Sequence, residues 1–86
     1  MNYKQISATS QIKSGAGKLQ LILTSSTSSG TFTVYDSPDG NITDPLIIAT
    51  VTPAAGSLLD FLDGLWFNHG CYIVVTNTIE LTVGYE

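Results

Sequence analysis

Apolar residues occupy every second position in the stretch Ile79-Glu80-Leu81-Thr82-Val83-Gly84-Tyr85. Successive side chains of a β-strand point to opposite faces, so this period of two predicts that the odd-numbered residues point inward. The stretch Thr-Phe-Thr-Val-Tyr at residues 31–35 repeats the pattern and predicts Phe32 and Val34 on one face. Both stretches are therefore predicted to be half-buried strands.

Three further segments are predicted to be strands from their apolar content. Leu19, Leu21 and Leu23 alternate with other residues, which predicts that they lie on one side of a strand. Residues 46–51 and 71–75 are apolar without clean alternation, as is typical of central strands that are covered on both faces.

Other parts of the chain carry weaker signals for secondary structure. Ile6 and Ile12 indicate one or two edge strands in the first part of the chain. Residues 57–61 and 65–67 are predicted to be shorter strand pieces. Residues 54–62 are the only candidate for a helical turn.

Turn-forming residues separate the predicted strands. They lie at residues 14–17, 25–30, 36–41, 53–56, 63–64, 68–70 and 77–78. Short strands with turn signals every 8–12 residues or so predict an all-β fold, a small antiparallel β-sandwich of about seven to eight short strands. An Ig-like or jelly-roll-like sandwich is expected, with a small barrel as the alternative. Residues 1–86 form one domain, in which residues 1–12 are an N-terminal arm or an edge strand.

The composition excludes several classes of partner. Only 12% of the residues are charged and the net charge is −4, with just three Lys and no clustered basic residues. We therefore expect no nucleic-acid partner, because phosphate binding needs a basic patch. The apolar runs are too short for a membrane helix, so no membrane partner is expected. Nine Ser and eleven Thr give a neutral surface that is easier to desolvate than a charged one.

No motif predicts a cofactor or a metal. Gly15-Ala16-Gly17-Lys18 contains part of a phosphate-binding loop, but its flanking residues do not fit the GxxxxGK[ST] pattern. We interpret it as a tight hairpin or bulge. The four oxygen-bearing residues Asp36, Asp39, Asn41 and Asp44 lack the spacing of an EF-hand. They are predicted to form a turn in which Asp and Asn side chains bond to their own backbone.

No catalytic residues are predicted. Asp60, Asp63 and His69 are the groups that a small hydrolase would use, and that hypothesis requires one pocket that joins all three. A domain of this size with short loops is not expected to form such a cleft. Cys71 lies in an apolar run and is predicted to be buried, without a disulfide.

Five short segments, taken in order, carry a resemblance to a known group of proteins. They read Ser-Gly-Ala-Gly-Lys-Leu at 14–19, Thr-Val-Tyr-Asp at 33–36, Ile-Ala-Thr-Val at 48–51, Gly-Cys-Tyr-Ile-Val at 70–74 and Leu-Thr-Val-Gly-Tyr at 81–85. The resemblance spans most of residues 13–86, and it is to small tailed-bacteriophage virion structural proteins. The resemblance implies a β-sandwich that decorates or cements the capsid, or a head-fibre-type component, without enzymatic activity.

This resemblance also implies partners and a location. The expected partners are further copies of the chain, as in a trimer, and the major capsid protein or another virion protein. The protein would be made in the host cytoplasm and be located in the virion. On the residues themselves, the predicted interface comprises Asn2, Tyr3, Gln5 and Trp66, because aromatic side chains are enriched at interfaces and edge strands offer unpaired backbone groups.

An alternative hypothesis is a carbohydrate- or host-receptor-binding module of a phage tail or spike. It predicts an exposed aromatic platform in which Trp66, Tyr35 or Tyr72 lies flat at the surface. At least one of Trp66 and Phe67 is expected in the core, because ring burial is a large apolar gain for a small domain.

Overall fold

The computed structural model describes residues 1–86 as six antiparallel strands without a helix, which confirms the predicted all-β class. The strands are β1 (Asn2–Ile6), β2 (Ser10–Ser14), β3 (Gly17–Tyr35), β4 (Leu46–Val51), β5 (Leu58–Phe67) and β6 (Gly70–Tyr85). The helical turn considered at residues 54–62 does not form. No segment is a helix long and apolar enough to cross a membrane.

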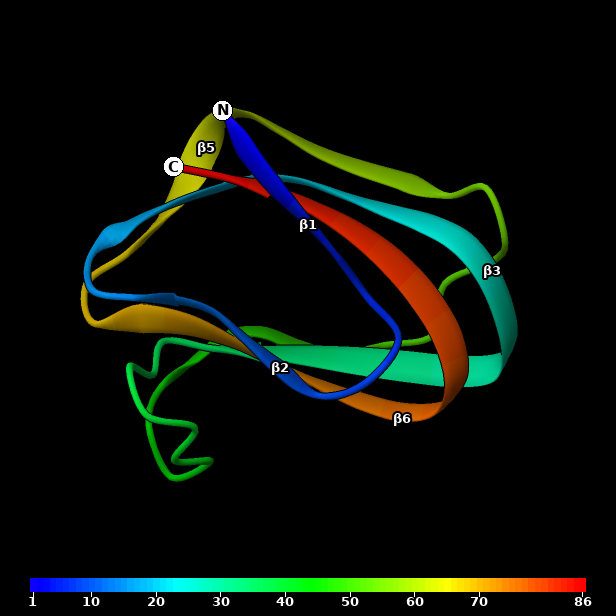
Figure 1. Ribbon diagram of the computed structural model, residues 1–86, viewed down its shortest axis with the longest axis horizontal. Coiled ribbons are helices and arrows are strands. Elements are labelled where there is room, and N and C mark those ends of the chain that lie inside the picture. The colour runs from blue at the N-terminus through cyan, green and yellow to red at the C-terminus, as the bar shows by residue number, and fades with distance from the viewer.

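β3 and β6 are the long central strands of the sheet. They pair along nearly their whole length, from Leu19 opposite Tyr85 to Tyr35 opposite Tyr72. Figure 1 shows both strands curving together at the same end of the molecule. At this bend two residues of β3, Ser28 and Ser29, lie opposite the single residue Thr78 of β6, and such a bulge increases local bending and twist.

The bend divides the sheet into two halves that face each other (Figure 1). In one half, the β1–β5 half, the strand order is β1-β6-β3-β5. In the other, the β2–β4 half, the order is β2-β6-β3-β4. Each long strand therefore contributes one segment to each half, and the other four strands are edges.

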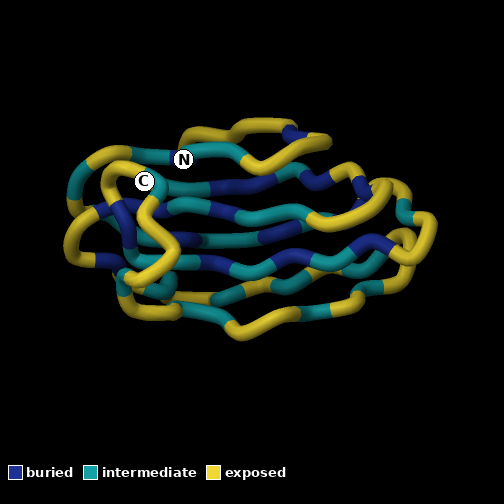
Figure 2. Tube along the Cα trace, turned by 90° about the horizontal axis from the view of Figure 1, so that it is seen from below, coloured by how far each residue is buried: buried dark blue, intermediate teal, exposed yellow.

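The core lies between the two halves. Twelve apolar residues are buried there: Ile6, Ile12, Leu19, Ile22, Phe32, Val34, Phe67, Cys71, Ile73, Ile79, Leu81 and Val83. Figure 2 shows buried positions recurring along the central strands, with exposed positions at turns and margins. The inward positions predicted for Phe32 and Val34, and for three of the four in residues 79–85, are confirmed. Tyr85 is only partly buried against the core.

The predicted number of strands, seven to eight, is wrong because three expected turns lie inside strands, and one of them, at residues 63–64, is part of β5. Residues 25–30 are part of β3, and residues 77–78 are part of β6. The left-handed backbone of Ser29 and Asn77 bends both strands without ending them. The side-chain amide of Asn77 also donates to the carbonyl of Ser29 at 2.9 Å, which holds the two bends together.

The predicted alignment of Leu19, Leu21 and Leu23 on one face is also wrong. Leu19 and Ile22 are buried, whereas Leu21 and Leu23 lie on the other face. The register shifts between Leu19 and Leu21 in the pairing with both neighbouring strands. One extra residue in a strand moves every following side chain to the opposite face of the sheet, because the side-chain period of a strand is two.

The placement of residues 46–51 as a central strand is wrong, and that of residues 71–75 is confirmed. β4 is an edge strand with irregular pairing, and Leu46 is 54% exposed. β6 has neighbours on both sides along both of its halves. The edge strands expected around Ile6 and Ile12 are β1 and β2, and the two short pieces expected at 57–67 join into β5.

Gly30 is required at the bend by the close approach of β6. A Cβ atom on Gly30 would lie 2.5 Å from Cβ of Ile79 and 2.6 Å from the carbonyl oxygen of Thr78. We therefore predict that Gly30→Ala lowers the free energy of unfolding by about 1–3 kcal/mol, as overpacking does in other cores. Urea unfolding followed by circular dichroism measures this change.

The matched control is Ser28→Ala, at an exposed position of the same strand. We expect this control to change the stability by less than about 0.5 kcal/mol. Equal stability of Gly30→Ala and wild type would show that β6 is not packed against the bend as described.

Candidate functional site

The outer face of the β1–β5 half is assigned from the strand register. Directly opposed residues of antiparallel strands share a face. In the register of the sheet, Tyr3 is opposite Gly84, and Gly84 is opposite Leu21. A Cβ atom on Gly84 would lie 2.9 Å from Cγ of Leu21, so the two residues share a face. Leu19 and Ile22 point into the core, so these residues point away from it.

The same register extends this face across the strands. The neighbouring row contains Gln5, Thr82, Leu23 and Leu58. Trp66 is opposite Lys18, which precedes the buried Leu19 and therefore faces outward. We call this surface the outer β1–β5 face, defined by residues Tyr3, Gln5, Leu21, Leu23, Leu58 and Trp66.

Exposed apolar side chains gather on this face and at the other margins of the sheet. The large hydrophobic residues that expose more than half of their surface are Met1, Tyr3, Ile42, Leu46, Leu58, Leu62 and Trp66. None belongs to β3 or β6, and three belong to β5. Met1 also lies over the outer β1–β5 face, since its sulfur would be 2.8 Å from a Cβ atom on Gly84.

The structure brings three of the four predicted interface residues onto this face. Tyr3 is 78% exposed and Trp66 is 69% exposed, at opposite edges of the β1–β5 half. Gln5 lies on the same face and donates from Nε2 to Oε1 of Glu80 at 3.1 Å. Asn2 is also exposed, but it is opposite Tyr85 and so shares the other side of β1.

Sequence reasoning missed Leu58 and Leu62 as parts of this exposed surface. Leu62 is 86% exposed and has a left-handed backbone with φ 45°. The Asp63-Gly64 pair that follows is a turn signal, and it could have indicated an outward position for Leu62. Leu58 lies within an apolar run, and nothing local distinguishes it from its partly buried neighbour Leu59.

A small polar cluster lies beside Trp66. Nζ of Lys18 lies 5.2 Å from the centroid of the Trp66 ring, and it forms an ion pair of 3.4 Å with Oε2 of Glu86. Nε2 of Gln20 donates to the same oxygen at 3.2 Å. The ammonium group of Lys18 therefore lies over the indole ring, and its positive charge is balanced by Glu86. The exposed surface of Trp66 itself is mainly apolar.

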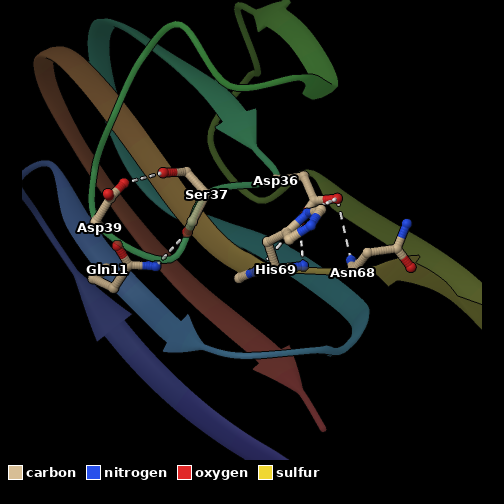
Figure 3. Close-up of polar contacts among 7 residues, drawn as sticks. Gln11, Asp36, Ser37, Asp39, Asn68 and His69 are labelled. Carbon is tan, nitrogen blue, oxygen red and sulfur yellow. Dashed lines mark hydrogen bonds and ion pairs between the residues drawn. The ribbon is translucent and has the colours of Figure 1, made fainter.

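A second polar cluster joins two loops at the end of the β2–β4 half. The carboxylate of Asp36 accepts hydrogen bonds from the backbone N–H of Asn68 (3.1 Å), His69 (2.8 Å) and Gly70 (3.2 Å) (Figure 3). Nδ1 of His69 lies 3.8 Å from the same carboxylate. Burial by itself raises the pKa of Asp36. The three hydrogen bonds and the charge of His69 together lower the pKa by more than burial raises it, so the pKa of Asp36 lies below its ordinary value.

The loop after Asp36 is anchored by buried backbone contacts. Ser37 is fully buried, and its carbonyl accepts a 2.7 Å hydrogen bond from Nε2 of Gln11, while its hydroxyl donates to Asp39 (Figure 3). A Cβ atom on Gly70 would collide with the carbonyl of Ser37, so only glycine allows the two loops to approach this closely. This cluster is structural: it fixes the loops that close the end of the sheet.

The predicted self-bonded turn is confirmed for Asp39 and Asn41. Oδ1 of Asp39 accepts from the backbone N–H of Asn41, and Oδ1 of Asn41 accepts from the backbone N–H of Thr43. Asp36 differs from the prediction, because its partners lie more than 30 residues away along the chain. No three Asp, Glu, His or Cys side chains are grouped so that they could hold a metal ion.

The pocket required by the hydrolase hypothesis does not form around Asp60, Asp63 and His69. The only pocket is lined by Gln5, Ile6, Ser7 and Glu80. Oδ1 of Asp60 accepts from the backbone N–H of Leu62, and His69 contacts Asp36 instead.

Cys71 is fully buried, as predicted. Burial, followed by the charge of Asp36, raises the pKa of its thiol to about 12. The thiolate that reacts as a nucleophile is therefore scarce at neutral pH.

The chain was compared with family models, curated proteins and solved structures, and none of them matches it.

The Asp36 cluster yields a prediction about acid stability. A carboxylate with a lowered pKa stabilises the folded state above its unfolded pKa of about 3.9, and this contribution is lost as the pH falls through the lower folded value. We expect Asp36→Asn to lower the free energy of unfolding by roughly 1–3 kcal/mol at pH 7, through the loss of charge-assisted hydrogen bonds. The difference from wild type should shrink in acid, below about pH 4.

Thermal or urea unfolding at a series of pH values measures this difference. Asp44→Asn is the control in the same loop, because the Asp44 carboxylate makes no hydrogen bond within the chain; only its backbone N–H does. A wild-type advantage over Asp36→Asn that stayed constant from neutral to strongly acid pH would contradict the role given to the carboxylate.

Proposed function

We propose that the protein is a non-enzymatic structural protein of a tailed-phage virion, a β-sandwich that decorates or cements the particle as a homo-oligomer. The two facing halves of the sheet support the sandwich description. The five segments that resemble such virion proteins lie in strands and turns of both halves. The function needs no catalytic group, only a rigid module whose surface can be covered by neighbours.

The distribution of exposed apolar residues carries this proposal. All seven exposed large hydrophobics lie on, or beside, edge strands or in the loop that leads to β4. Burial of apolar surface provides about 25 cal/mol per Å². Contacts made through the margins would therefore gain free energy and leave the core between the central strands intact.

The neutral surface supports the same proposal. The chain has twice as many Ser and Thr residues, nine and eleven, as charged residues, three basic and seven acidic. Removing a charge from water costs more than removing a hydroxyl group that finds a partner. On a symmetric shell, many modest contacts of this kind add up through avidity.

A specific observation favours the alternative, a carbohydrate- or host-receptor-binding module of a tail or spike. Trp66 is 69% exposed, as an aromatic platform requires. Tyr35 and Tyr72 are only partly exposed and lie opposite each other in the β2–β4 half. The indole of Trp66 also contacts Lys18, so it is less free to stack on a sugar ring.

The virion proposal predicts that the protein is a component of purified particles. We expect mass spectrometry of particles of the encoding phage to detect the chain in a fixed ratio to the major capsid protein. Cryo-electron microscopy should then place it at symmetry-related sites on the surface. Absence of the chain from purified particles would overturn the proposal.

The alternative makes a different prediction. If the protein is a glycan-binding module, a glycan array gives specific binding that Trp66→Ala abolishes. A blank array for a protein that is present in particles would leave decoration or cementing as the function.

A further inference from the structure

We propose that residues 46–66, which contain β4, β5 and the turn between them, open from the molecule as one unit while β1, β2, β3 and β6 stay folded. We call these residues the β4–β5 flap. Three features of the structure support this inference, which is independent of the proposed function. They are the position of the core, the single strand to which the flap is bonded, and the way Asp36 holds both ends of the flap.

The β4–β5 flap contributes no buried residue to the molecule. All twelve apolar residues of the core lie outside it, and so does every other buried residue. Six of its apolar side chains pack against the core but are only partly buried: Ile47, Ile48, Val51, Leu59, Phe61 and Leu65. Segments with few buried apolar contacts open at a lower free energy than the core of the same protein. Opening of the flap therefore uncovers the core but leaves the core residues packed on one another.

The flap is bonded to one strand only. β4 and β5 both pair with β3 and with no other strand. The backbone N–H of Thr24 in β3 donates to the carbonyl of Ser57 at 2.8 Å, and its carbonyl accepts from the N–H of Gly56 at 2.7 Å. The hydroxyl groups of Thr33, also in β3, and Thr50 share a hydrogen bond of 2.8 Å. Since β3 also pairs with β6 along nearly its whole length, the loss of these bonds leaves β3 in the sheet.

Asp36 holds the two ends of the flap together from outside it. Its backbone N–H donates to the carbonyl of Pro45 at 2.8 Å, directly before the flap. Its carboxylate accepts from the backbone N–H of Asn68, His69 and Gly70, just after the flap (Figure 3). None of these groups belongs to the flap, so they stay bonded while it opens. The opening therefore stops at Asp36 and does not spread into β6.

Native-state amide hydrogen exchange, followed residue by residue by NMR, tests the proposal. We expect the protected amides of β4 and β5 to exchange through one shared opening, whose equilibrium constant is at least about tenfold larger than that of the opening that exposes the β6 amides. Thr24 gives the sharpest distinction. It is 1% exposed and lies in the central strand β3, yet its N–H is bonded to Ser57 of the flap, so its amide should exchange with the flap.

Three variants separate opening of the flap from unfolding of the whole protein. Leu59→Ala removes a flap side chain that packs on the core, and it should raise the opening constant of the flap amides about tenfold. Leu58→Ala is the matched control, since Leu58 is 55% exposed, and it should change this constant by less than about threefold. Asp36→Asn should speed exchange of the β6 amides about tenfold or more and leave that of the flap amides unchanged, because Asp36 lies outside the part that opens.

Three results would overturn the inference. The first is one opening constant shared by the amides of β4, β5 and β6 in the wild-type protein. The second is an amide of Thr24 that exchanges together with β6. The third is an Asp36→Asn protein in which exchange of the flap amides rises as much as that of the β6 amides.

Discussion

The antiparallel pairing of β3 with β6 is the constraint on which the rest of the structure depends. Each of the other four strands pairs with one of these two and with no other strand. The two long strands bend together, so a single ladder supplies the centre of both halves and positions the core between them. Any change that straightened the bend would separate the two halves and expose the core. The bend therefore determines the stability of the molecule more than any single edge strand does.

The strand class and part of the core could be read from the sequence, because both depend on local alternation. Ile79, Leu81 and Val83 are buried as the period of two requires. The bend could not be read in this way. Ser, Thr and Gly at residues 25–30 are common in turns, and only the hydrogen bonds to distant β6 keep them in a strand. The bulge after Leu19 is equally hidden, because a single added residue leaves no compositional signal and yet exchanges the two faces.

The outer β1–β5 face also has a part that could be predicted from the sequence and a part that could not. Tyr3 and Trp66 could be predicted from residue type, since aromatic residues near edge strands often form contacts. The grouping of Tyr3, Leu58 and Trp66 on one face depends on register across four strands, which no local pattern encodes. Asp36 shows the same limit. Its carboxylate is adjacent to a turn of its own, but it binds the backbone of residues 68–70, which tertiary pairing brings beside it.

This division separates the residues that stabilise the fold from the large apolar residues that remain exposed. The buried apolar residues lie mostly on β3 and β6, whereas the largest exposed ones lie on or beside the edge strands. Substitutions at Leu62 or Trp66 remove little from the core, because both residues are more than two-thirds exposed. The low charge of the chain fits this arrangement, because few charged groups would have to lose water when the margins are covered.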